Sequence, residues 1–185
     1  MTIPYWDTLL HIISGFLCAA IGFSIIDLLN KNNRKPKLPP VYLAVFSLCF
    51  SMTIGVGWEF FEFAADNLLF TDMQKDSFID NISTVEFNTN KTNKAIALND
   101  INQTIVYDKL GNKLAIVNNG YLDIGLYDTM GDLFVNLLGA IFFSVLCYFY
   151  TLDKNKYKLL QNFIPVKTVA SKKYIYDKYT KKRES

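Results

Sequence analysis

Three long apolar stretches constrain this chain more than any other feature of its sequence. Residues 8–29, 42–61 and 133–152 are apolar almost without interruption, and each is about 20 residues long, which suffices for a helix to cross a hydrocarbon core of roughly 30 Å. Buried helices of a soluble protein are the alternative, but such helices are usually shorter and keep a polar face. The pattern therefore predicts an α-helical polytopic membrane protein with three transmembrane helices.

The first apolar stretch does not resemble a signal peptide. Residues 1–7 contain no Lys or Arg, and no small-residue cleavage site follows the apolar run. We expect this stretch to stay in the mature protein. Cys18, Cys49 and Cys147 all fall inside apolar stretches, which favours packing roles over a disulfide framework.

The distribution of charge predicts the orientation of the chain. The linker 30–40 carries four basic residues and no acid, and the tail 153–185 carries ten basic residues against three acids, whereas residues 67–127 carry five lysines and seven acids. The positive-inside rule then places the linker and tail in the cytoplasm, and the N-terminus and the insert 67–127 outside. In this organisation residues 1–66 hold the first two helices and residues 128–152 hold the third.

The tail also interleaves basic residues with tyrosines, a composition found in nucleic-acid-binding segments. Basic residues beside a membrane span more commonly contact acidic lipid head groups, and no nucleic-acid-binding motif accompanies the charge. We therefore expect membrane lipid, and not nucleic acid, as the partner of the tail.

The insert is predicted to hold a small extracytoplasmic β element. Residues 103–117 alternate in polarity and are rich in β-branched residues, with turn-forming residues at 108–112, which is a hairpin signal. Residues 118–120 predict another turn, and residues 96–98 a third strand. We expect about three strands that cap the outer ends of the helices.

Polar residues recur on one face of each predicted helix. The positions are Asp7, His11, Gly15, Cys18 and Gly22 in the first helix, Ser51, Gly55, Glu59, Glu62 and Asp66 in the second, and Asp128, Asp132, Asn136, Gly139 and Phe143 in the third. Their spacing puts each set within an arc of roughly 80°. Because of the predicted topology, the charged end of every stripe lies at the same membrane level, and the small residues below favour close helix packing.

Acids near a hydrocarbon core are costly, and no Lys or Arg lies on these stripes. A bound cation, shared protons, water or a basic ligand are the ways to compensate them. The candidate metal ligands are Asp7, His11, Glu59, Glu62, Asp66, Asp128, Asp132 and Asn136. Their hard oxygen atoms favour magnesium, manganese or calcium over zinc.

The alternative is that these are hydrated acids at helix ends, with Asp7 and Asp128 as N-caps. That interpretation does not explain the acids of the second helix, because carboxylates at a helix C-terminus oppose the helix dipole. Asp27 lies off the stripe near the inner end of the first helix, and we interpret it as an interfacial acid.

Three motifs resemble the YjdF-like family of bacterial inner-membrane proteins. They are Trp-Asp-x-x-x-His at Trp6 to His11, Trp-Glu-x-x-Glu-x-x-x-Asp at Trp58 to Asp66, and Tyr-Asp-x-x-x-Asp-x-x-x-Asn at Tyr127 to Asn136. The resemblance spans nearly the whole chain and implies a bacterial plasma-membrane protein, but the family brings no established activity. Its members often have further hydrophobic segments upstream of the first motif. A looser similarity, through Asp132, Asn136 and Gly139, links the chain to VanZ-like proteins.

Three functions remain open from the sequence. The first is a divalent-metal-dependent hydrolase or transferase acting on envelope lipid head groups, with His11, Glu59 and Asp132 as candidate catalytic residues. The second is a binding or transport protein for a cation, a proton or a basic envelope ligand, which predicts a homo-oligomer because three helices alone make a poor pathway. The third is an envelope sensor that docks a partner through its β element.

Overall fold

The structure is a computed structural model that describes residues 5–32, 37–153 and 156–157. Linker residues 33–36 and nearly all of the predicted cytoplasmic tail lie outside the described residues. The chain forms two compact units, one comprising Met1–Gly55 and Val135–Ser185 and the other Val56–Phe134. We call them the first unit and the second unit.

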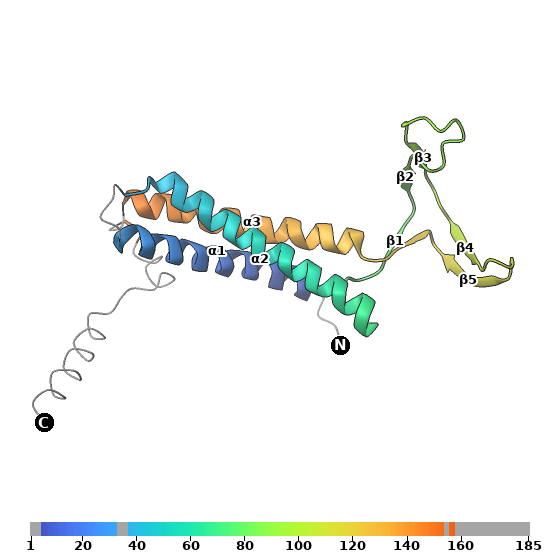
Figure 1. The fold of residues 1–185 in the computed structure, drawn as a ribbon, viewed down its shortest axis with the longest axis horizontal. Helices are drawn as coiled ribbons and strands as arrows, with labels where there is room; N and C mark the ends of the chain where they lie inside the picture. The colour runs from blue at the N-terminus through green and yellow to red at the C-terminus, as the bar shows by residue number, and fades with distance from the viewer. Residues whose placement is uncertain (1–4, 33–36, 154–155, 158–185) are drawn as a thin grey trace, which may run out of the picture. The chain divides into compact units, whose positions relative to one another are not determined.

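Three long helices account for the apolar stretches. They are α1 (Trp6–Asn32), α2 (Pro40–Leu69) and α3 (Leu126–Leu152) (Figure 1). All three are long and apolar enough to cross a membrane, which confirms the predicted helix count among the described residues. Pro40 opens α2, where its missing N–H costs no helical hydrogen bond. Both α2 and α3 extend beyond their apolar stretches, so the acids of their stripes lie on regular helix.

The first unit packs its helices closely through small residues. Phe23, Leu43, Phe143 and Cys147 are fully buried in its core. A Cβ added at Gly139 would overlap the carbonyl oxygen of Ile12, so glycine lets the backbones of α1 and α3 approach closely. The small-residue positions of the predicted stripes therefore serve helix packing in this unit.

The second unit contains six short strands, where the sequence predicted about three. They are β1 (Ser77–Ile79), β2 (Ile82–Thr84), β3 (Ile96–Leu98), β4 (Gln103–Tyr107), β5 (Lys113–Asn118) and β6 (Tyr121–Asp123). These form three antiparallel pairs, β1 with β6, β2 with β3 and β4 with β5. The strand β3 confirms the prediction at 96–98. The sequence analysis did not predict β1, β2 and β6, which have three residues each and are too short to show a clear period of two.

The predicted hairpin is the β4–β5 pair, and its turn lies at 108–112 as expected. The Asp108 carboxylate accepts hydrogen bonds from the backbone N–H groups of Leu110 at 2.9 Å and Asn112 at 2.8 Å. The Asn112 side-chain amide donates a further bond of 2.9 Å to Asp108 Oδ2, and this bond, followed by the backbone bonds, holds the pKa of Asp108 below its ordinary value. Gly111 supplies the positive φ of 84° that the turn requires.

Candidate functional site

Three carboxylates of the second unit gather into one cluster, which we call the acid triad: Glu59, Glu62 and Asp132. Glu59 and Glu62 lie three residues apart on α2 and so share one helix face, while Asp132 comes from α3. One carboxylate oxygen from each lies within 4.8 Å of the others. All three residues are buried, with only 5% of Glu59 and 6% of Glu62 and Asp132 exposed. The structure thus brings together three of the eight predicted ligand residues within this unit.

The electrostatics of the acid triad depend on the negative charge of its own carboxylates. Neither α2 nor α3 contains a Lys or Arg. Like charges at this separation in a medium of low dielectric constant repel strongly, so the ionised triad favours a cation or the uptake of protons. Carboxylate oxygens converging from two helices are also the ligands that magnesium, manganese and calcium prefer.

Trp58 orients one member of the acid triad. Its indole Nε1–H donates a hydrogen bond of 2.7 Å to Glu62 Oε1, and its ring lies against Phe61 with centroids 5.3 Å apart. This bond uses one lone pair of the Glu62 carboxylate and fixes its rotamer. The sequence analysis named Trp58 only as the first residue of the second motif, although its spacing of four residues from Glu62 was a readable signal.

Asp66 and Asp128 have backbone partners in the loop that follows α2. Asp66 accepts hydrogen bonds from the N–H groups of Met73 at 2.7 Å and Gln74 at 2.8 Å. Asp128 accepts one from the N–H of Lys75 at 3.0 Å. These two predicted ligands therefore contact the loop.

The sequence alternative took Asp7 and Asp128 as N-caps, but the carboxylate that bonds to the backbone of the first turn of α3 belongs to Asp123, which the sequence analysis did not name. Asp128 lies within the first turn of α3, but Asp123 is the residue whose carboxylate accepts the N–H of Tyr127, at 2.9 Å. Asp123 is only 9% exposed and also pairs with Ser77 in the β1–β6 ladder. It thus joins the strand pair to the start of α3.

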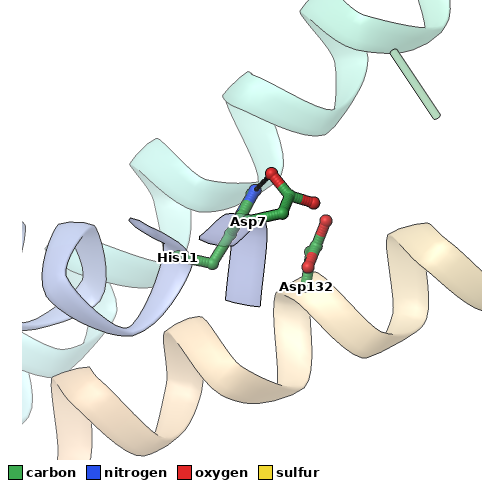
Figure 2. A group of neighbouring side chains, drawn as sticks. All are labelled: Asp7, His11 and Asp132. Carbon is green, nitrogen blue, oxygen red and sulfur yellow. Dashed lines mark ion pairs between the residues drawn. The ribbon is translucent and has the colours of Figure 1, made fainter. Parts of the chain in front are cut away.

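Asp7 and His11 form a pair in the first turns of α1. His11 Nε2 lies 3.9 Å from Asp7 Oδ1, and Figure 2 marks this contact with a dashed line. The His11 side chain is 11% exposed and that of Asp7 39%. The spacing of four residues predicted in the sequence therefore brings an acid and an imidazole together on one helix face.

Asn136 takes part in helix packing in the first unit. Its amide Nδ2 donates to Met52 Sδ at 3.5 Å, and a Cβ added at Gly55 would lie 2.6 Å from the same nitrogen. Elsewhere in this unit, two serines that the sequence analysis did not assign contact each other, with 3.5 Å between the hydroxyls of Ser144 and Ser47. Among the residues described, Asn136 is thus a polar packing residue between glycine-lined helices.

One family of known proteins matches this chain. No curated protein and no solved structure matches it. The sequence model of a family described as predicted membrane protein, DUF2238, matches residues 1–153, which includes all three helices, the insert and every motif residue named above. The YjdF protein is a member of this family, which confirms the resemblance drawn from the three motifs. The chain therefore belongs to the DUF2238 family of predicted membrane proteins.

Proposed function

We propose that this membrane protein binds a divalent cation at the acid triad. The observation that carries the proposal is the convergence of three buried carboxylates, with ligand oxygens within 4.8 Å of one another, from two helices without a basic residue. A cation offsets their mutual repulsion more completely than hydration can at buried positions. An oxygen-only set favours magnesium, manganese or calcium over zinc.

We also propose in which membrane the protein lies and how it is oriented there. We place the protein in the bacterial plasma membrane, with the N-terminus and the insert outside and the linker and tail in the cytoplasm, on the basis of the basic residues that flank the helices. A single cysteine replacing Leu110 in the hairpin turn should then react with a membrane-impermeant maleimide in intact cells. A cysteine at Ser185 should react only after the cells are opened, and the reverse pattern would invert this topology.

An enzymatic role is the second candidate, and it depends on the cation. The hard oxygen donors of the acid triad suit the ions that polarise phosphate oxygens, so the substrate class we propose is a phosphate-bearing lipid head group of the envelope, cleaved or transferred. Cation-dependent turnover of such a lipid that Glu59→Gln abolishes would support this role. Cation binding without turnover would favour a binding or transport function, and then a homo-oligomer in native lipid is expected.

The experiment that tests cation binding is thermal unfolding in detergent after treatment with a chelator. Adding one of magnesium, manganese or calcium at about 100 times its Kd should stabilise the wild type by about 2.7 kcal/mol. Glu59→Gln and Asp132→Asn should each lose this stabilisation. Asp27→Asn is the matched control, because Asp27 is also a buried helical acid, 6% exposed, although the sequence pattern suggested an interfacial position.

Two outcomes would contradict the proposal. One is a wild type that no divalent cation stabilises. The other is an Asp27→Asn variant that loses the stabilisation as completely as the acid-triad variants do, since the effect would then reflect total charge and not the triad.

A further inference from the structure

We infer that Asp66 and Asp128 are positioning residues that fasten residues 71–75 to α2 and α3 and thereby hold the two halves of the acid triad in register. We call residues 71–75 the strap. The inference rests on the proposed function, because it assigns the two acids a role in shaping the cation site and removes them from the set of ligands. All residues involved belong to the second unit.

The strap is bonded to α2 by a single carboxylate. Asp66 Oδ1 accepts hydrogen bonds from Thr71 Oγ1 and the N–H of Met73, both at 2.7 Å, and Asp66 Oδ2 accepts the N–H of Gln74 at 2.8 Å. Hydrogen bonds to an ionised carboxylate are about twice as strong as neutral ones. Phe70, just past the end of α2, has a positive φ of 55° that reverses the chain toward Asp66.

The same strap is bonded to the first turn of α3. Gln74 Nε2 donates to Thr129 Oγ1 at 2.6 Å, and the N–H of Lys75 donates to Asp128 Oδ2 at 3.0 Å. Gly125, with a φ of +110°, comes so close that an added Cβ would lie 2.6 Å from Cβ of Gln74. Gln74 therefore contacts both helices, through its backbone to Asp66 and through its side chain to Thr129.

The residues that anchor the strap lie close to the acid triad along both helices. Asp66 follows Glu62 by four residues on α2, and Asp128 precedes Asp132 by four residues on α3, so each anchor lies one helical turn from a triad carboxylate. A shift of one helix against the other would break the bonds at Gln74 and at Lys75. The strap thus fixes the separation of the two helix faces that carry the triad, as outer residues do around metal ligands.

The variants Asp66→Asn and Gly125→Ala test this role by different means. Asp66→Asn replaces the acceptor of the Gln74 N–H with an amide group, whereas Gly125→Ala obstructs Gln74 without changing any charge. Asp72→Asn is the control, because Asp72 is an exposed acid within the strap and its replacement removes the same formal charge. Two readouts are needed: amide hydrogen exchange at Met73 and Gln74, and the Kd for manganese of the full chain in detergent.

We expect faster exchange at Met73 and Gln74 in both test variants, together with a manganese Kd raised by about 10- to 100-fold. Asp72→Asn should leave exchange unchanged and alter the Kd by less than about threefold, as expected for an exposed charge. Faster exchange with an unaltered Kd would overturn the positioning role. A Kd raised as much by Asp72→Asn as by Asp66→Asn would overturn it too, because charge alone would then explain the effect.

A third measurement separates this inference from the proposed function if the wild type binds none of magnesium, manganese and calcium. Spin labels at Phe63 on α2 and Met130 on α3, both exposed, report the distance between the helices in a variant whose three cysteines are replaced by alanine. A distance that changes with Asp66→Asn would retain the strap as a device that sets helix separation and reject the cation site. An unchanged distance would overturn the strap inference itself.

Discussion

In the first unit the buried polar side chains are mainly hydroxyls and an amide, whereas in the second unit they are mainly carboxylates. Ser47 donates to the carbonyl of Ala19 at 2.6 Å, and Ser51 donates to that of Gly15 at 2.8 Å, so each hydroxyl joins α2 to α1. Glu59, Glu62 and Asp132 instead face one another. Polar groups bonded to helix carbonyls contribute to packing, whereas ionised carboxylates that lie close together repel one another.

The largest change in stability that tests this comparison is expected at the glycine contacts of the first unit. Gly139→Ala should lower the free energy of unfolding by about 3 kcal/mol or more, because the new methyl group would overlap the backbone of α1. Gly131→Ala on the same helix is the control. An added Cβ there meets no atom within 4 Å, so we expect a gain of roughly 0.5–1 kcal/mol from helix propensity. Unfolding in mixed micelles measures the free energy of unfolding of both variants. Equal values for the two would show that close packing at Gly139 does not support the fold.

The acid triad should respond in the opposite direction from a packing residue. In the presence of a chelator, Glu59→Gln and Asp132→Asn should each raise the free energy of unfolding by about 1–2 kcal/mol, because each removes one of three like charges at a buried site. The double variant should gain less than the sum of the two, since the charges repel one another. Loss of stability in both single variants would mean that the acids act as packing residues, and the contrast between the units would disappear.

A smaller loss is expected at the hydroxyls of the first unit. Ser51→Ala should lower the free energy of unfolding by roughly 0.6 kcal/mol, the average for a hydrogen bond between membrane helices. Thr53→Ala is the matched control, because the Thr53 hydroxyl donates to Cys49 within its own helix at 2.9 Å and so joins no second helix. Chemical unfolding that ranks Thr53→Ala as the more damaging change would contradict the assignment of Ser51 to the α1–α2 contact.

The smallest effect concerns a carboxylate outside the helices. Hydrogen bonds lower the pKa of Asp108 in the folded hairpin, so its ionised form stabilises the turn at pH values above its ordinary pKa of about 4. That contribution should be lost as the pH falls through the lowered pKa. Amide exchange at Leu110 and Asn112 should therefore show weaker protection near pH 3 than near pH 6, after correction for intrinsic rates. Asp108→Asn should abolish this pH dependence, and its persistence would assign the effect to another group.

Local sequence was sufficient for features that depend on neighbouring residues. The three helices follow from long apolar stretches, and the β4–β5 hairpin follows from alternation on either side of an Asp and Gly turn. The pairs β1–β6 and β2–β3 could not be predicted, because their partners lie far apart in the chain and each strand has only three residues. Pairing at such distances is set by tertiary contacts and not by a periodic pattern.

In the candidate site too, some features follow from local sequence and others only from the tertiary structure. Helical spacing alone placed Glu59, Glu62 and Asp66 on one face of α2. Only the tertiary structure decided that the first two join Asp132, while Asp66 bonds to the strap. The reason is that periodicity fixes the direction of a side chain within its own helix, whereas the rotation of a neighbouring helix and the path of a loop decide which groups it meets.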